Sequence, residues 1–153
     1  MKNNSKIIKK TNEGWDGIPK KVYKTETLNF KDISRFSLLG ESDNEQELNM
    51  QTRYFEIDAG GYSSLEYHRH PHSVVVIKGK GSLVLGDEIH PLELHDVVYI
   101  SPETLHQFHA DAGEPLGFIC IVDRYRDKPS LPDEAMLDAV LGKDSEARMK
   151  IRR

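Results

Sequence analysis

The chain carries the run Glu66-Tyr67-His68-Arg69-His70-Pro71-His72, followed by an apolar segment at residues 74–77. Three of its seven histidines therefore fall within five residues, at every second position. Side chains two positions apart in a β-strand point to the same face, so we expect Glu66, His68 and His70 to converge on one side of a strand. Pro71 cannot donate a backbone hydrogen bond to a neighbouring strand, so His72 is expected to begin the next strand. Imidazole and carboxylate groups together suit Zn, Fe, Mn, Ni or Cu, and the run predicts a divalent metal site on a β scaffold.

Length, charge and cysteine content limit the classes of protein to consider. A chain of 153 residues predicts one domain with a sizeable core. The net charge of -4 gives no overall field that favours nucleic acid or a membrane. The single cysteine excludes a disulfide within the chain and fits a reducing compartment. No window approaches the roughly 18 apolar residues of a membrane-spanning helix, and we expect a cytoplasmic protein with no membrane or nucleic-acid partner.

Short strand signals recur through the middle of the chain, separated by turns rich in Gly, Pro and Asp. We expect a turn at residues 59–61 and a loop at 40–49, whereas residues 32–39 show no clear period. No helical period interrupts the series, so the pattern predicts an all-β sandwich or barrel. The expected strands cover residues 22–30, 53–58, 82–85, 89–94, 97–100, 105–109 and 116–123.

The two ends of the chain differ from this middle. Residues 1–21 are polar and lysine-rich, with Trp15 as the one large apolar anchor, and predict a basic N-terminal arm. A helix is expected to start near Asp133, with acidic residues in its first turn, and to end at Gly142. Residues 143–153 are mostly charged and are expected to be loosely held. The predicted organisation is an arm at 1–21, one barrel domain at 22–130, and a helix with a charged tail at 131–153.

Taken together, these segments resemble the cupin superfamily, in particular its small single-domain members. The first cupin motif has His-x-His, a glutamate and a closing glycine at fixed spacing. Counting back from Gly79 puts His72 at the glutamate position, His68 at the second histidine and Glu66 at the first histidine. In the second motif, His106 falls where the histidine ligand belongs. The resemblance implies a double-stranded β-helix, or jelly-roll barrel, and a homodimer.

The resemblance also implies a divalent metal ion held by Glu66, His68, His72 and His106. The carboxylate and one histidine are exchanged relative to the usual motif, but the inventory of three imidazoles and one carboxylate is kept. His70 follows the same alternation and sits beside a proline where the strand should turn. It remains an alternative ligand, a residue at the rim, or a partner of the ligands.

Other candidate residues are given structural interpretations. The remaining histidines, His90, His95 and His109, lie in or near expected turns and are predicted at the surface. Cys120 is predicted to be a small buried apolar residue, because no nearby base or charge is visible that would make it a nucleophile. The residues after the last strand, Arg124, Arg126 and Asp127, are expected to form a solvated or interface network. A dry wall around the metal site is expected from Val74, Val75 and Ile77.

Two functions from different classes follow from these residues. The first is a metal-dependent enzyme acting on a small organic substrate, with dioxygenase chemistry placed ahead of isomerase or lyase chemistry. The second is a non-catalytic cupin that binds a small ligand or a metal, such as a sensor. A stoichiometric metal ion (Fe, Mn, Ni and Zn are not distinguished) and a polar group that moves protons in the pocket would favour the enzyme.

Overall fold

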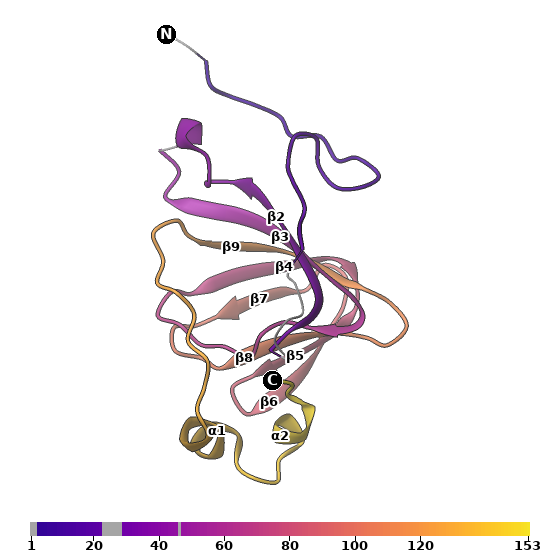
Figure 1. Cartoon of the computed structure of the whole chain (residues 1–153), viewed down its shortest axis with the longest axis vertical. Helices are drawn as coiled ribbons and strands as arrows, with labels where there is room; N and C mark the ends of the chain where they lie inside the picture. Colours follow the sequence, from indigo (N-terminus) through magenta and orange to yellow (C-terminus); the bar gives the residue numbers. More distant parts are fainter. Residues whose placement is uncertain (1–2, 23–28, 46) are drawn as a thin grey trace.

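A curled antiparallel sheet forms the body of the molecule (Figure 1). The computed structural model describes residues 3–22, 29–45 and 47–153. A short 3-10 helix, η1 (Asp43–Glu45), follows β2, and two helices, α1 (Glu134–Leu141) and α2 (Glu146–Lys150), follow the last strand. The all-β prediction is confirmed, with two C-terminal helices where one was expected. The strands are β1 (Lys21–Val22), β2 (Lys31–Leu39), β3 (Met50–Tyr62), β4 (His72–Gly79), β5 (Gly81–Leu85), β6 (Glu88–Leu92), β7 (Val97–Ile100), β8 (His106–Ala110) and β9 (Leu116–Asp123).

Strand β3 is long and joins the two parts of the sheet. The strand order is β6-β5-β8-β3-β9-β4-β7, and β2 also pairs with β3. The expected turn at 59–61 is wrong, because β3 continues through these residues to Tyr62. Gly60 has a φ of 75°, and a Cβ on Gly61 would lie 2.5 Å from the carbonyl oxygen of Lys31. The two glycines therefore let the strand bend against β2 instead of ending it.

Irregular pairing explains why one strand was missed in the sequence. Residues 32–39, which showed no period, belong to β2 and pair with β3. The register shifts between Lys31 and Ile33 and again between Ser37 and Leu39. Each bulge shifts the alternation of side chains by one position, so no continuous period of two remains. The strand expected at residues 22–30 falls largely on residues 23–28, which lie outside the described part of the chain.

The C-terminal segment packs against the outside of the sheet and forms a second apolar cluster. Its buried members are Leu65, Val84, Leu105, Leu137, Leu141 and Ala147. Gln107, fully buried on β8, donates to the carbonyl oxygen of Arg152 at 2.7 Å and accepts from its backbone N–H at 2.9 Å. The expectation of a loosely held tail at 143–153 is therefore wrong, because a buried amide binds its backbone.

The main core lies inside the curled sheet and supports the wall of the histidine site. It includes Val74 and Val76 from β4, Phe108 from β8, and Phe118 and Cys120 from β9. Trp15 packs on the outside against Phe36 and Tyr54, with ring centroids 5.3 and 4.7 Å away. Within the described ranges, no helix is long and apolar enough to cross a membrane.

Candidate metal centre

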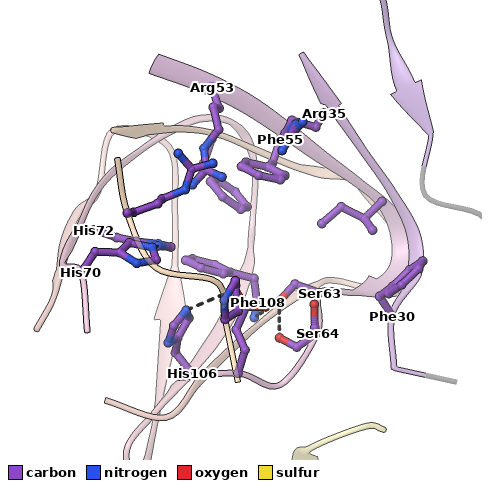
Figure 2. Close-up of a pocket in the computed structure, with 15 residues that line it drawn as sticks. Phe30, Arg35, Arg53, Phe55, Ser63, Ser64, His70, His72, His106 and Phe108 are labelled. Carbon is purple, nitrogen blue, oxygen red and sulfur yellow. Dashed lines mark hydrogen bonds and ion pairs between the residues drawn. The ribbon is translucent and has the colours of Figure 1, made fainter. Parts of the chain in front are cut away.

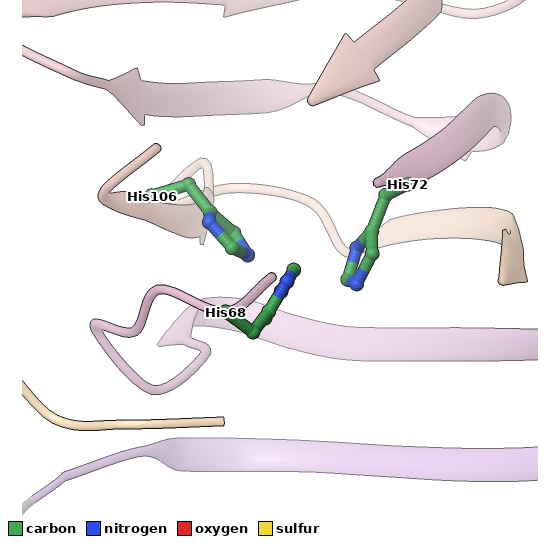
Figure 3. Close-up of side chains that lie close together, drawn as sticks. All are labelled: His68, His72 and His106. Atoms are coloured by element: carbon green, nitrogen blue, oxygen red, sulfur yellow. The ribbon is translucent and has the colours of Figure 1, made fainter. Parts of the chain in front are cut away.

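Three histidines from separate parts of the chain converge at one point (Figure 3). His68 lies in the loop before β4, His72 is the first residue of β4, and His106 is the first residue of β8. One ring nitrogen from each can be chosen so that all three lie within 4.8 Å of one another. All three side chains are buried. Three imidazoles at this separation are the kind of donor set that binds a transition metal.

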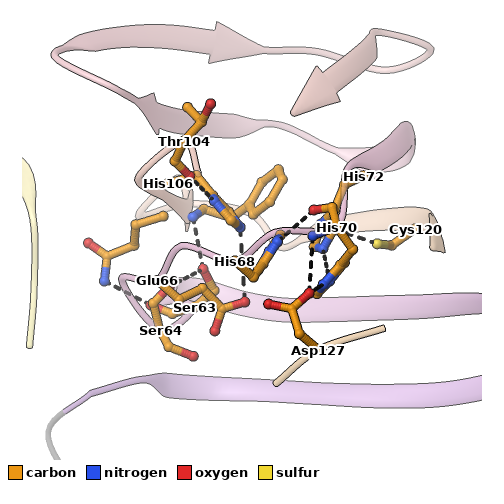
Figure 4. Close-up of polar contacts among 12 residues, drawn as sticks. Ser63, Ser64, Glu66, His68, His70, His72, Thr104, His106, Cys120 and Asp127 are labelled. Carbon is orange, nitrogen blue, oxygen red and sulfur yellow. Dashed lines mark hydrogen bonds and ion pairs between the residues drawn. The ribbon is translucent and has the colours of Figure 1, made fainter. Parts of the chain in front are cut away.

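The outer nitrogens of these rings are held by other groups. Nδ1 of His68 lies 2.7 Å from the carbonyl oxygen of His70, and Nδ1 of His106 lies 2.8 Å from that of Thr104 (Figure 4). A carbonyl oxygen only accepts, so both Nδ1 atoms carry the proton and both Nε2 atoms keep a lone pair. Nε2 of His68 is buried and has no hydrogen-bond partner within the described chain. A ring held through one nitrogen, with the other free to donate a lone pair, is typical of a metal-ligating histidine.

Burial keeps the three imidazoles neutral. It lowers the pKa of His106 to about 4 and lowers the pKa values of His68 and His72 as well. The charges that neighbouring histidines would carry lower these pKa values further. Neutral imidazole is the form that binds a metal ion, so the site is ready to bind one at neutral pH without first losing protons.

The loop before β4 replaces the strand expected at residues 66–70, and that expectation is wrong. The backbone N–H groups of Arg69 and His70 donate to the carboxylate of Asp127 at 2.9 and 3.1 Å, which holds this segment in a bend. The bond from the Arg69 N–H, followed by the hydrogen bond with the His70 ring, lowers the pKa of the Asp127 carboxyl group well below its usual range. His72 begins β4 as expected from Pro71. The histidines therefore converge through a loop fixed by a distant carboxylate, without strand alternation.

Glu66 lies beside His106 because their backbones bond to each other. The N–H of each donates to the carbonyl oxygen of the other, at 3.1 and 3.0 Å. Oε1 of Glu66 lies 3.9 Å from Nε2 of His106. Burial raises the pKa of Glu66, and a side-chain hydrogen bond with Ser64 opposes this rise. The structure thus places the expected carboxylate at the edge of the histidine group.

His70 also reaches the group. Its ring stacks on that of His68 with centroids 3.7 Å apart, and its Nε2 lies 3.2 Å from Nε2 of His72. Nδ1 of His70 lies 2.8 Å from Oδ1 of Asp127. Two ligands with bonds of about 2.1 Å at right angles around one metal ion lie about 3 Å apart, so this spacing suits shared ligation. Glu66 and His70 thus each lie beside one histidine of the group, and the choice between them as fourth ligand stays a prediction.

A cavity of about 330 Å³ opens beside these histidines (Figure 2). Its apolar wall comes mainly from Phe55, Phe108 and Phe118. The wall expected from β4 is wrong: Val74 packs in the core, Val75 is partly buried, Ile77 is exposed, and none of them lines the cavity. Strand β4 turns its odd-numbered positions outward. The residues lining the cavity are Phe30, Ile33, Arg35, Arg53, Phe55, Ser63, Ser64, Glu66, His70, His72, His106, Phe108, Phe118, Arg126 and Pro129.

Comparison with known proteins identifies the family of this fold. Residues 53–122 match the model of the Cupin domain family. The chain is 39% identical over 134 residues to a protein of Rhodospirillum rubrum named 1-methylthio-D-xylulose 5-phosphate methylsulfurylase, covering 87% of this chain and 83% of that protein. This chain is a cupin. The small single-domain type expected from the sequence is also confirmed.

Solved cupin structures support the assignment over nearly the whole chain. A cupin 2 conserved barrel domain protein from Rhodopseudomonas palustris is 39% identical, with a TM-score of 0.87 over 97% of this chain and 100% of that one. A cupin-2 domain protein from Rhodospirillum rubrum is 38% identical, with a TM-score of 0.77 over 85% of each chain.

The pocket of this cupin contains charged residues that the sequence did not reveal. Arg35, Arg53 and Arg126 come from β2, β3 and the segment after β9, so no spacing along the chain connects them. Asp127 was expected in a solvated or interface network, but it binds the histidine loop. His109 was expected at the surface, but it is buried on β8, close enough to the C-terminal segment for the charges of Lys150 and Arg152 to lower its pKa.

Cys120 is buried as expected, but its surroundings are more polar than the sequence suggested. Nη2 of Arg53 lies 3.2 Å from its sulfur atom, and Nδ1 of His72 lies 3.6 Å away. Burial raises the pKa of the thiol, and the charge of Arg53 opposes that rise. The expectation that no charge lies near this cysteine is therefore wrong.

Proposed function

We propose that this cupin is a metal-dependent enzyme that moves the methylsulfur group of a phosphorylated methylthio-ketose. The observation that carries the proposal is the convergence of three neutral imidazoles at the wall of a cavity large enough for a small substrate. The name of the R. rubrum relative supplies the reaction type, and its 39% identity extends over 87% of this chain.

The donor set fits a divalent metal ion. His68, His72 and His106 would hold it through nitrogen, with Glu66 as the fourth ligand and His70 as the alternative. The buried Nε2 of His68, which has no partner within the described chain, is the clearest sign of this fit. A bound divalent ion would supply Lewis-acid chemistry, stabilising negative charge that develops on a substrate carbonyl. The donor set suits Fe, Mn, Ni and Zn alike.

The proposed reaction balances with a thiol as the second substrate. The bond between C1 of the ketose and the methylthio sulfur breaks, and a bond forms between that sulfur and the thiol sulfur. The electron pair stays on C1, which takes up the proton released by the thiol. The ketose carbon is reduced and the sulfur is oxidised, giving a 1-deoxyketose phosphate and a methyl disulfide. The phenylalanine wall excludes water from the bound ketose.

The test is to incubate the metal-loaded protein with 1-methylthio-D-xylulose 5-phosphate and 2-mercaptoethanol and to follow the methyl protons by NMR. We expect the S–CH3 signal of the ketose to be replaced by a C–CH3 signal and a methyl disulfide signal in equal amounts. An unchanged spectrum, with full metal occupancy and bound substrate, would contradict this reaction and favour the non-catalytic binding alternative.

Dioxygenase chemistry, which the sequence placed first, stays a prediction with its own assay. Oxygen consumption by the Fe-loaded protein with the same ketose phosphate would support it. The relative's name favours sulfur-group transfer, for which no consumption of oxygen is expected.

The proposal includes a cytoplasmic homodimer. Strand β7 is one end of the sheet order, and its Val97 and Tyr99 are 72% and 67% exposed. Ile77 on the neighbouring β4 is also exposed. A second copy covering this edge would bury the apolar side chains and pair the open strand. Sedimentation analysis of the parent and of Val97→Asp with Tyr99→Ser should give a dimer and a monomer; a monomeric parent would contradict the proposal.

A further inference from the structure

Three arginines share the pocket with the histidines. Arg35 comes from β2, Arg53 from β3, and Arg126 from the segment after β9. Figure 2 shows Arg35 and Arg53 entering on one side of the pocket, while the rings of His72 and His106 lie on another. The pocket therefore has a cationic side and an imidazole side.

These guanidinium groups have few partners for their burial. Arg53 is only 7% exposed, and its Nε has no hydrogen-bond partner within the described chain; the same holds for the buried Nε of Arg35. Burying a cation without a paired anion destabilises the folded protein. A contribution to stability therefore does not explain why these arginines lie in the pocket. Unused N–H groups of arginine at a cavity wall suit a ligand that accepts hydrogen bonds.

The negative charge of the pocket does not balance these cations. Glu66 is the only carboxylate among the described residues that line it; the charge of Arg53 acts to lower its pKa, but one carboxylate does not balance three cations. Glu41 is 3.9 Å from Nη2 of Arg35, but it does not line the pocket. Burial lowers the pKa of Arg126, and the charges of Arg53 and Arg35 lower it further, so the three cations act on one another. An anion placed among them would relieve this repulsion.

We propose that Arg35, Arg53 and Arg126 form a phosphate-binding subsite that orients a phosphorylated substrate with its reacting end toward the histidines. The subsite rests on the proposed function for the identity of its substrate. Guanidinium groups bind phosphate oxygens through two parallel N–H bonds, and a phosphate monoester carries enough acceptors for several of them. This arrangement makes phosphate a requirement for productive binding.

The test measures binding by isothermal titration calorimetry at fixed ionic strength. The probes are D-xylulose 5-phosphate, D-xylulose and inorganic phosphate, with the full chain as purified. We expect the sugar phosphate to bind at least about 10-fold more tightly than D-xylulose. Equal affinities for the two sugars, or no binding of either phosphate, would overturn the subsite.

Single substitutions identify the side chains involved. Arg35→Gln, Arg53→Gln and Arg126→Gln are each expected to weaken binding of D-xylulose 5-phosphate about 10- to 100-fold and to leave D-xylulose unchanged. Arg124→Gln is the matched control: it removes the same charge two residues from Arg126, but Arg124 donates to the carbonyl oxygens of Ser42 and Glu45 outside the pocket. A uniform loss in all four variants would assign the effect to overall charge and overturn the proposal.

Two double variants complete the test. One replaces Arg53→Gln if that variant does not fold, and the other shows whether phosphate binds at the metal or at the arginines. If Arg53→Gln does not fold, the double variant Arg35→Gln with Arg126→Gln tests the same subsite while the most buried arginine stays in place. The double variant His68→Ala with His106→Ala, which removes two metal ligands, should still bind inorganic phosphate. Loss of phosphate binding there would place the anion at the metal and overturn the subsite. Phosphate binding with no sulfur transfer would leave the subsite standing and reject only the proposed function.

Discussion

The two sides of the pocket differ in charge: one has neutral imidazoles and the other has guanidinium cations. On the histidine side, burial keeps the rings neutral, and the carbonyl partners hold the proton on Nδ1, so that Nε2 of His68 and of His106 keeps its lone pair. On the arginine side, the buried Nε atoms of Arg53 and Arg35 have no hydrogen-bond partner within the described chain. The first side suits a positive ion and the second a negative group. Burial alone therefore does not identify a binding site; the atoms that burial leaves without a hydrogen-bond partner do.

The largest expected effect comes from removing two ligands on the histidine side. His68→Ala with His106→Ala should reduce bound metal to less than about a tenth of an equivalent, because two of three imidazole donors are lost. The barrel should stay folded by circular dichroism, since most of the core lies elsewhere. Metal retention equal to that of the parent, measured by plasma mass spectrometry, would mean that the site is misplaced.

A smaller loss of metal affinity is expected from removing the fourth ligand, and it tests whether Glu66 or His70 has that role. Glu66→Gln is expected to weaken metal binding about 10- to 100-fold, and more than His70→Ala does. Competition with a chromophoric chelator measures both affinities under the same conditions. The reverse order would exchange the roles of the two residues and would fit the 3.2 Å separation between His70 and His72.

The pH dependence of metal binding sharpens the contrast further. A histidine with its ordinary pKa of about 6.5 binds protons in competition with metal below that pH. Burial lowers the pKa of His106 to about 4 and also lowers those of His68 and His72. We therefore expect the affinity to fall less than about 10-fold between pH 7.5 and pH 6. A loss of about 50-fold over this range, measured by chelator competition, would show that the three rings titrate like exposed histidines.

The smallest effect concerns His109, a buried histidine that lies on β8 with His106 but outside the metal site. Burial and the charges of Lys150 and Arg152 lower the pKa of His109 to about 4. Because the unfolded chain binds this proton more readily, His109 adds stability above pH 6.5 that is lost as the pH falls from 6.5 to 4. His109→Leu should reduce this loss by at most about 3 kcal/mol in urea unfolding of metal-free protein. Equal curves for the parent and for His109→Leu would contradict the account.

The sequence predicted the fold and the candidate ligands unequally well. Strands 97–100 and 116–123 were located correctly, because unbroken apolar runs there are bounded by turns. His68, His72 and His106 were selected by motif spacing, which depends only on chain order. The bend at 66–70 was not predictable, since it depends on Asp127 about 60 residues away.

The grouping of the three arginines could not be predicted from the sequence for a similar reason. The three arginines meet only after β2, β3 and the segment after β9 come together, and the bulges in β2 had already obscured that strand. The division into an arm, a barrel and a C-terminal segment at residues 21 and 130 stays a prediction.

Metal analysis tests the central claim most directly. Protein purified without an affinity tag or chelator should contain about one Fe, Mn, Ni or Zn ion per chain by plasma mass spectrometry, because three neutral imidazoles converge in the pocket. Less than about a tenth of an equivalent, with no uptake when these metals are added, would contradict the account and leave the histidine cluster as a packing feature of the barrel.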